Sequence, residues 1–406
     1  MTILDFISDS SHSSSILFDA STFENIEVRP GRILSYQKII LSSKSNASSK
    51  EEHDDFDHDA DDTSSSNTNA NSTAYHHLLF IHGSCGASTQ FYSLIHSLQD
   101  MLRNHQHSVN SSVQLVCHLF DAWGCGQSSA LVPYKPNTKD FHASFSSQQL
   151  LLDLEAVLAH IRKQQEEHQD SRSSTLYIVA HSYGVSQILQ VLHQKIDHLD
   201  QHNKSTEINN SRNIPIQGLI LISAVLKDPS DPLTRDGGHF IFKWFPTFIL
   251  RHIQSMLTQN FIHHAIHPQN IHILQEDAIR LSNANDMNMC KAFYTQQRYI
   301  SSEQVMEVSC DYYADSSITS SRSSSTTGIG NESIQYPKFL LIHGKEDQIF
   351  PLSKVYLFHD AMVKGIEKRK KNRDIPMIHV VDFASHQVFQ EKPNQVAAMI
   401  WEFMSS

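Results

Sequence analysis

The sequence has little of several features that define other classes of protein. Apolar residues make up only 39% of its 406 residues, and adding the 13 glycines leaves the share below the roughly 45–50% of an ordinary globular chain. No apolar run approaches the ~20 residues that span a bilayer. The first residues combine neither a charged start nor a long apolar run, so we expect no signal peptide. Polar segments must therefore dilute an otherwise ordinary core.

Positive charge and cysteine are scarce as well. The chain has 32 Lys and Arg against 43 Asp and Glu, and eight of the acids lie between Glu51 and Asp62. A nucleic-acid partner is therefore not expected, because binding one requires a basic face. The cysteines are odd in number, scattered and without CxxC spacing, which favours a reduced, intracellular and cytoplasmic chain. They are Cys85, Cys117, Cys125, Cys290 and Cys310.

Three polar stretches account for the dilution. The longest, 42–73, is acidic and rich in Ser and Asn, and we predict that it is a disordered insertion. The others are 201–213 and the Ser-rich 316–333, and all three are expected to be insertions in surface loops.

Between these stretches, short apolar runs alternate with helical periodicity. The apolar runs typical of buried strands are Ile33–Leu41, His77–Ile81, Val113–Phe120, Leu176–Ala180, Leu219–Ile222, Phe339–Ile342 and Met377–Val381. Helices are predicted from Ser88, over Ser146–His168 and Val185–Ile196, and near Leu352–Val363 and Asn394–Phe403. Strands that alternate with helices indicate an α/β fold with a parallel sheet covered on both faces.

The alternation divides the chain into four parts. We expect an N-terminal segment at 1–32 and a first part of the core at 33–225. The segment 226–306 shows no strand signal and is helical and aromatic, so we predict a helical cap inserted after a sheet strand. The second part of the core is then 307–406.

The strongest chemical signal is the run from Ala180 to Gly184 (AHSYG), which lies between a predicted strand and a predicted helix. A serine at such a turn can be held with its hydroxyl above the edge of the sheet. Small residues two positions away on either side allow strand and helix to approach each other, although Ala180 stands where the usual pattern has glycine. Ser182 is therefore a candidate nucleophile.

Two loops in the first half of the core lie beside this turn. In the run IHGSCG at 81–86, Gly83 allows a turn in which backbone N–H groups face outward. The N–H groups of Ser84 and of Tyr183, the residue after the candidate nucleophile, can then converge on one oxyanion. The run DAWGCGQS at 121–128 is Gly-rich but matches no nucleotide-binding pattern, and we interpret it as a structural loop beside the site.

Two later loops supply an acid and a base. The run LIHGKEDQIFP at 341–351 places Asp347 just beyond a strand end, with Glu346 as a local competitor. Asp382 also follows a strand, but it is close in sequence to the candidate base. That base is His386, which its position after the last strand selects among 27 histidines. Open α/β sheets build their sites at the carboxyl ends of their strands, so these groups are expected to meet there.

Together these segments resemble the α/β-hydrolase superfamily, of the AB hydrolase-1 type. The matching motifs are the His-Gly loop, the DxxGxGxS loop, the HSYG elbow, the HGxxDxxxP acid segment and the terminal histidine segment, which extend from about Ile33 to Phe403. The HSYGVS run at 181–186 and the cap make the chain most similar to abhydrolase-domain-containing, lipase-like serine hydrolases. The resemblance implies an α/β-hydrolase fold, with a mostly parallel sheet, helices on both faces and a helical cap.

The resemblance also implies roles. Ser182 is the nucleophile, His386 is the general base and then the acid, and Asp347 orients the imidazole, while Ser84 and Tyr183 supply the oxyanion N–H groups. The implied activity is hydrolysis of a carboxylic ester with an apolar acyl part, and the group is tied to lipid metabolism. Dehalogenases and epoxide hydrolases of the superfamily have aspartate at the elbow, so Ser182 excludes them. A peptidase, a thioesterase, an acyltransferase and a catalytically silent binding protein stay open as alternatives.

The cap carries an aromatic run at 240–250. Its rings either form a mouth that accepts an acyl chain or touches a membrane surface, or they pack against the core. We assign substrate contacts to Phe240 and Trp244 of the cap and to His82 and Trp123 of the loops.

Metal ions and cofactors are not expected to take part. The cap histidines His263, His264 and His267 lack the spacing of a metal site, and no acid stands at a ligand position. The expected partners are therefore a small-molecule or lipid ester and, through the cap, a membrane surface.

Overall fold

The computed structural model describes residues 20–42, 74–105, 113–136, 138–167, 174–202, 216–235, 240–311, 338–368 and 375–406. The three polar stretches fall almost entirely outside these residues, and so does the predicted disorder of 42–73. Within the described ranges, no helix has both the length and the apolar character that crossing a membrane requires.

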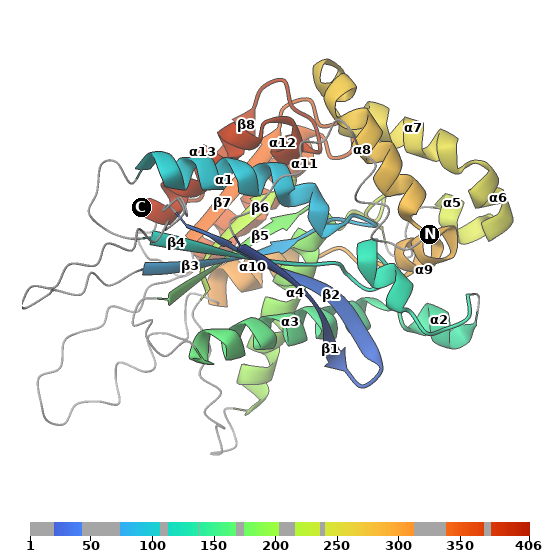
Figure 1. Cartoon of the computed structure of the whole chain (residues 1–406), viewed down its shortest axis with the longest axis horizontal. Coiled ribbons are helices and arrows are strands. Elements are labelled where there is room, and N and C mark those ends of the chain that lie inside the picture. The colour runs from blue at the N-terminus through green and yellow to red at the C-terminus, as the bar shows by residue number, and fades with distance from the viewer. Residues whose placement is uncertain are drawn as a thin grey trace, which may run out of the picture.

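Eight strands of the described chain form one sheet in the order β1-β2-β4-β3-β5-β6-β7-β8 (Figure 1). Their bounds are β1 Ala20–Arg29, β2 Arg32–Leu41, β3 Ala74–Ile81, β4 Val113–Phe120, β5 Ser174–His181, β6 Ile216–Ile222, β7 Lys338–Gly344 and β8 Ile378–Val381. Neighbouring strands in the part of the sheet ordered β4-β3-β5-β6-β7-β8 are parallel, whereas β2 is antiparallel to both β1 and β4. The predicted mostly parallel sheet is confirmed.

Among the eight strands of the described sheet, β1 is the one that the sequence did not predict. It lies within the segment 1–32, and it forms an antiparallel hairpin with β2 through a turn in which Gly31 has a φ of 71°. It is an edge strand, and its Phe23 points into solvent while Ile26 is buried. A strand with so few inward apolar residues gives a weak periodic signal.

Helices cover both faces of the sheet, as expected. One face carries α1 (Tyr92–His105), α12 (Val388–Glu391) and α13 (Pro393–Ser405), which pack on side chains such as Leu78 and Phe80 of β3. The other face carries α3 (Ser147–Glu167), α4 (Tyr183–His202), α10 (Ser302–Asp311) and α11 (Leu352–Glu367), which pack on the alternate residues Leu79 and Ile81. Successive strand residues point to opposite faces, so both cores are built from the same strands.

The helices that lie between β6 and β7 in the chain form the cap and one core helix. The cap helices are α5 (Phe240–Trp244), α6 (Thr247–His252), α7 (Gln254–Ala265), α8 (Ile271–Ala284) and α9 (Met287–Gln296), and they lie together beyond one end of the sheet (Figure 1). By contrast α10 packs against α4 and α11. The predicted cap boundary at 306 therefore falls inside a helix of the core.

Short elements complete the described chain. They are η2 (Ser88–Phe91), η3 (Gly126–Leu131), α2 (Lys139–Ala143) and η4 (Pro268–Asn270).

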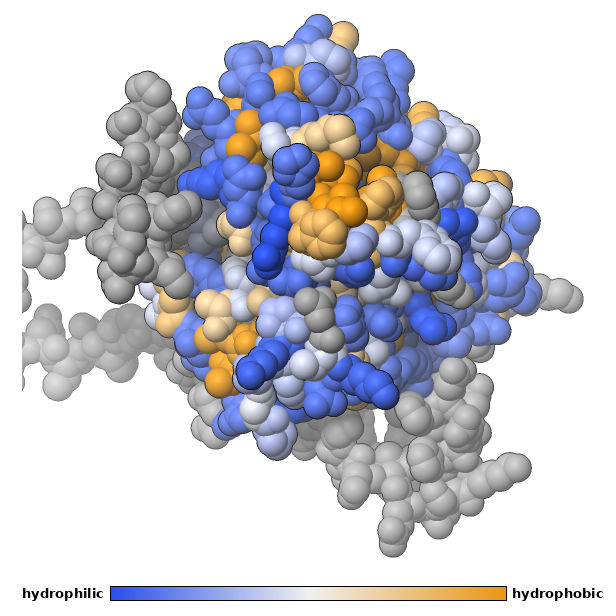
Figure 2. All heavy atoms as spheres, turned by 90° about the vertical axis from the view of Figure 1, so that its right-hand side faces the viewer, coloured by the Kyte–Doolittle hydropathy of each residue, from blue (hydrophilic) through white to orange (hydrophobic). Residues whose placement is uncertain are grey.

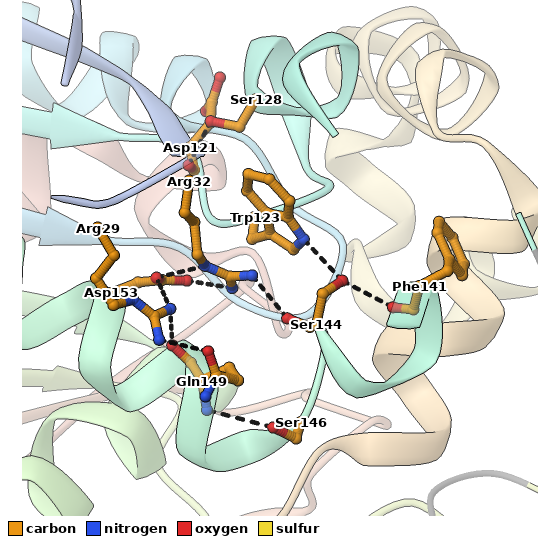
Figure 3. A network of polar contacts seen from close by, with 10 residues as sticks. All are labelled: Arg29, Arg32, Asp121, Trp123, Ser128, Phe141, Ser144, Ser146, Gln149 and Asp153. Carbon is orange, nitrogen blue, oxygen red and sulfur yellow. Dashed lines mark hydrogen bonds and ion pairs between the residues drawn. The ribbon is translucent and has the colours of Figure 1, made fainter. Parts of the chain in front are cut away.

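A buried ionic network ties the β1–β2 hairpin to α3 (Figure 3). The carboxylate of Asp153 accepts hydrogen bonds from the guanidinium groups of Arg29 and Arg32, and its side chain is only 3% exposed. Arg32 also donates to the Ser144 carbonyl at 2.8 Å and lies 4.2 Å above the ring of Trp123. One carboxylate thus holds two arginines that come from the edge of the sheet.

We expect the substitution Asp153→Ala to lower the free energy of unfolding by about 3–5 kcal/mol, because it leaves buried guanidinium charge without its counter-charge. Chemical unfolding followed by tryptophan fluorescence measures the change. The control Glu155→Ala removes a more exposed acid from the same helix and should cost less than about 1 kcal/mol. Equal effects of the two substitutions would contradict the prediction.

Candidate active site

Ser182 occupies the sharp turn between β5 and α4. Its φ is 54°, in the left-handed region that residues with a side chain rarely adopt, and its N–H donates to the Ile222 carbonyl at 2.9 Å. The packing around the turn requires glycine, because a Cβ on Gly184 would lie 2.7 Å from the carbonyl oxygen of Ile81. This close packing holds the strained serine in place.

His386 lies between Ser182 and Asp347. Its Nε2 is 3.1 Å from the Ser182 Oγ, and its Nδ1 is 2.8 Å from the Asp347 Oδ2. The other carboxylate oxygen of Asp347 accepts the backbone N–H groups of Ile349 and Phe350, each at 2.8 Å. A carboxylate only accepts, so Nδ1 carries the hydrogen and Nε2 is free to accept the serine proton.

The two acids that compete with Asp347 have other partners. Glu346 accepts the backbone N–H of Ala384 at 3.3 Å, and Asp382 is an exposed residue paired with Lys345 at 2.6 Å. Only Asp347, among these three acids, makes a hydrogen bond to the imidazole of His386.

Two further buried histidines brace the site, and the sequence did not single them out. His181 donates through Nε2 to the His386 carbonyl at 3.0 Å, and His343 donates to the Phe350 carbonyl at 2.9 Å. Burial lowers the pKa of His343, and it lowers the pKa of His181 well below its ordinary value. Both rings are therefore neutral supports of the backbone around His386. Their only sequence signal is that each is the first residue of a motif, HSYG for His181 and HGxxDxxxP for His343.

The loop after β3 lies beside Ser182. A Cβ on Gly83 would lie 3.1 Å from the Ser182 Cβ, so glycine allows this loop to approach the serine. The hydrogen bonds of the described residues leave the backbone N–H groups of Ser84 and Tyr183 without partners. The hydroxyl of Ser84 instead donates to the Gln297 side chain at 2.9 Å. Ser84 thus lines the cavity with Ser182, Tyr183 follows Ser182 in the chain, and their role as oxyanion donors stays a prediction.

A cavity of about 320 Å³ extends from Ser182 into the cap. Its catalytic end is lined by Gly83, Ser84, Ser182 and His386. Most of the remaining wall is apolar and comes from the cap helices, and it includes Ile241, Phe242, Leu257, Phe261, Leu274, Ala278, Leu281, Met287 and Tyr294. Its polar part is rich in carboxamides, namely Gln90, Gln254, Asn260, Asn285, Gln297, Gln387 and Gln390.

The structure does not place His82 and Trp123, which were predicted to contact substrate, on the wall of the cavity. His82 is buried, and both ring nitrogens are occupied, since Nδ1 donates to the Gly83 carbonyl at 2.7 Å and Nε2 accepts the Ala122 N–H at 2.9 Å. Trp123 is buried under Arg32. These side chains brace the loops around the site, and neither lines the cavity.

Of the two cap residues predicted to bind substrate, the structure describes the side chain of Trp244 alone. Trp244 is 73% exposed and does not line the cavity, because it projects from the outer side of α5. Phe240 begins α5, and its side chain lies outside the described residues. The residues of α5 that line the cavity are their neighbours Ile241 and Phe242.

An apolar patch marks the outer face of the cap. Apolar side chains gather on this face of the molecule, to which α5 and α6 belong (Figure 2). Trp244 and Phe248 are exposed by more than two thirds, and Phe245 is partly exposed between them in sequence. Lys243 and Arg251 come from the same two helices.

Other reactive groups near Ser182 are accounted for. The Cys85 thiol has its pKa raised well above the ordinary value by hydrogen bonds with Cys125 and Cys290 and by burial, so it is a neutral part of the wall. Among the residues that the structure describes, no group of three His, Cys, Asp or Glu side chains is arranged to hold a metal ion.

Comparisons with known proteins identify the family and the fold of the chain. The model of the alpha/beta hydrolase family matches residues 78–399. No curated protein sequence matches the chain. A bromoperoxidase from Bacillus anthracis has a similar structure, with 10% identity and a TM-score of 0.53 over 95% of this chain and 100% of that one.

Two other solved structures are similar over 95% of this chain and 98% of their own. They are a serine hydrolase from the bacterium Cycloclasticus zankles, with 13% identity and a TM-score of 0.52, and an esterase from Thermogutta terrifontis, with 11% identity and a TM-score of 0.51. Likeness at such identities shows the fold, and the family match covers most of the chain. The chain therefore belongs to the alpha/beta hydrolase family.

Proposed function

We propose that this protein is a serine hydrolase that cleaves carboxylic esters with an apolar acyl part. The observation that carries the proposal is the hydrogen-bonded path from Ser182 through His386 to Asp347, with distances of 3.1 and 2.8 Å, at the end of a largely apolar cavity. A serine hydroxyl is a weak nucleophile at neutral pH, and a neighbouring base that an acid orients is what activates it.

The reaction follows from this arrangement. Ser182 Oγ attacks the ester carbonyl while His386 Nε2 takes its proton, and the N–H groups of Ser84 and Tyr183 stabilise the resulting oxyanion. His386 then gives the proton to the leaving alcohol, which leaves an acyl-enzyme on Ser182. Water attacks the acyl-enzyme with His386 again as the base, and this step releases the acid and restores the serine.

The cavity wall supports an apolar and uncharged ester. The side chains that the structure describes in this wall are aliphatic, aromatic, carboxamide, hydroxyl and thiol groups, together with His181 and His386. An ionised group on the substrate would lose its hydration here without gaining a counter-charge from them. The carboxamides can pair with carbonyl and hydroxyl groups of an ester.

Labelling with a fluorophosphonate tests the proposal, because this probe reacts covalently with an activated serine. We expect the wild type to be labelled and His386→Ala to lose labelling. The matched control Ser255→Ala removes an exposed serine on α7 and should keep it. A panel of uncharged esters, thioesters and aminopeptidase substrates then separates the possible activities. A folded wild type that takes no label would overturn the proposal and favour a binding protein.

We also propose that the outer face of the cap contacts a lipid surface. Trp244 and Phe248 expose large rings to solvent, and Lys243 precedes Trp244 in α5. Aromatic rings next to basic side chains suit the interface of a bilayer. The same helix α5 lines the cavity through Ile241 and Phe242, so a bound surface would lie next to the cavity.

Sedimentation with vesicles of phosphatidylcholine and phosphatidylserine measures this contact. We expect the double variant Trp244→Ser, Phe248→Ser to weaken vesicle binding at least tenfold, since burying one such side chain is worth about 1.5–3 kcal/mol. The control Phe23→Ser removes an exposed ring from β1 and should bind like the wild type. Binding that is unchanged in the double variant would rule out this surface.

A further inference from the structure

A short segment, residues 297–300, leads from the last cap helix α9 to the core helix α10 and lies against the candidate site. We call it the strap. We propose that Gln297 of the strap is a positioning residue that holds the oxyanion loop through Ser84, and that the strap joins the cap to both oxyanion donors. The inference rests on the proposed function, since it concerns the same reaction.

The strap contacts the first oxyanion residue through a side chain. Gln297 is 3% exposed, and its Oε1 accepts the hydroxyl hydrogen of Ser84 at 2.9 Å. Its own backbone N–H is bound to the Phe293 carbonyl at 2.9 Å, in the last turn of α9. A buried carboxamide fixed in this way gives the Ser84 loop one preferred position.

The strap also contacts the second oxyanion residue. The N–H of Arg298 donates to the Tyr183 hydroxyl at 3.3 Å, and the ring of Tyr299 packs edge-on against the Tyr183 ring, with centroids 5.3 Å apart. Phe293 of α9 touches the same ring from another side, at 5.7 Å. The contacts to Ser84 and to Tyr183 thus come from neighbouring residues of one segment.

The far end of the strap is anchored to the core. The N–H of Ile300 donates to the Ser186 hydroxyl at 3.3 Å, and its carbonyl accepts the N–H of Lys227 at 2.8 Å. Lys227 belongs to the chain that leaves β6 for the cap. The cap therefore leaves and rejoins the core at one point, and the strap fixes the end of α9 beside Ser182.

This arrangement has a kinetic consequence. An oxyanion donor acts only when its N–H points at the developing charge. Movement of the loop away from this position therefore reduces the stabilisation of the transition state more than it reduces the binding of the substrate. The contact between Gln297 and Ser84 is a neutral hydrogen bond, which is worth about 1 kcal/mol and corresponds to roughly fivefold in rate.

The test compares Gln297→Ala, Ser84→Ala and the double variant on the best ester of the panel. We expect each single substitution to lower kcat about five- to tenfold with KM changed less than about twofold. We expect the double variant to be no slower than Ser84→Ala, because both substitutions remove the same hydrogen bond and Ser84→Ala also removes the interaction of its hydroxyl with the Tyr299 side chain. Ser84→Ala removes the hydroxyl group and keeps the backbone N–H of residue 84. It therefore tests the hydrogen bond between Ser84 and Gln297 by removing its donor, whereas Gln297→Ala removes its acceptor.

The control is Gln304→Ala, which removes a carboxamide that accepts the N–H of Ser301 just beyond the strap and does not touch Ser84. It should leave kcat unchanged, and the thermal midpoints of all variants show that they are folded. A kcat that is unchanged in Gln297→Ala, single effects that multiply in the double variant, or an equal loss in Gln304→Ala would each overturn the inference. A wild type that hydrolyses no ester would overturn the proposed function and, with it, the inference.

Discussion

The substitution Ser182→Ala is expected to lower kcat for ester hydrolysis on the order of 10⁶-fold, the largest effect that any single change in this protein should have. The substitution removes the atom that forms the acyl-enzyme, and the bond to His386 Nε2 at 3.1 Å disappears with it. Substrate binding should change little, because one hydroxyl is a small part of a wall formed by many side chains. The effect should therefore appear in kcat and not in KM.

The substitution Asp347→Asn should give a smaller and distinct loss, of about 10⁴-fold. An asparagine amide at this place donates to Nδ1, so it favours the tautomer in which Nε2 carries the hydrogen and cannot accept the serine proton. By contrast Asp382→Asn should keep nearly full activity, because that acid is exposed and paired with Lys345. Steady-state kinetics on one uncharged ester measures all three variants.

The order of these losses is the critical result. If Asp382→Asn were as damaging as Asp347→Asn, the assignment of the acid would be wrong. If Ser182→Ala kept more than a trace of activity in a clean preparation, Ser182 would not be the nucleophile.

The parallel part of the fold was predictable because its strands are buried on both faces. Such strands are continuous apolar runs, and the run Val113–Phe120 coincides with β4 at both ends. The strand β1 lies at the edge of the sheet and exposes Phe23, so its apolar residues show no comparable run. Its place in the sheet depends on Arg29 and the buried carboxylate of Asp153, which are 124 residues apart in sequence.

The sequence predicts where the candidate site lies in the fold better than it predicts which side chains contact each other there. The positions of Ser182 and His386 after strand ends locate them at one edge of the sheet. The sequence predicted Asp347 as the acid, with Glu346 and Asp382 as competitors, because strand ends alone do not tell which carboxylate turns toward the ring. The turn after β7 decides it, since its N–H groups bind one oxygen of Asp347 and leave the other for His386.

The substrate contacts could not be read from the aromatic residues of the cap. In α5, Ile241 and Phe242 line the cavity whereas Trp244 faces solvent. Successive residues of a helix differ by about 100° in direction, so a shift of one or two positions moves a side chain from the cavity to the surface. Only the packing of α5 against α9 and the core fixes which residues face inward.

Buried histidines should make the folded protein sensitive to acid. His118 lies inside the sheet, where its ring nitrogens contact the Tyr36 hydroxyl and His77, and burial lowers its pKa well below the ordinary value. Burial likewise lowers the pKa values of His82, His181 and His343 around the site. These four imidazoles are neutral in the folded chain at neutral pH.

The direction of the effect follows from proton binding. A histidine in the unfolded chain titrates near pH 6.5, so below that pH the unfolded state takes up protons that the folded state refuses. Each such group lowers the free energy of unfolding by up to about 1.4 kcal/mol for every pH unit below that value. Four such groups together lower it by up to about 5 kcal/mol per pH unit. Glu391 acts the other way, because burial raises its pKa and it favours the folded state in acid, but it is one group against four.

Urea unfolding at pH 7, 6 and 5 measures this dependence. We expect the free energy of unfolding to fall steeply below pH 6.5, and the variant His118→Asn, which keeps a polar side chain that does not titrate, to reduce the slope by up to about 1.4 kcal/mol per pH unit. The control His263→Asn lies on the exposed side of α7, where the imidazole is in water in both states, and should keep the wild-type slope. A free energy of unfolding that is flat between pH 7 and pH 5 would mean that these buried rings bind protons in the folded chain. In that case His181 would carry charge next to His386, and the rings of His181 and His343 would not be neutral supports of the backbone around His386.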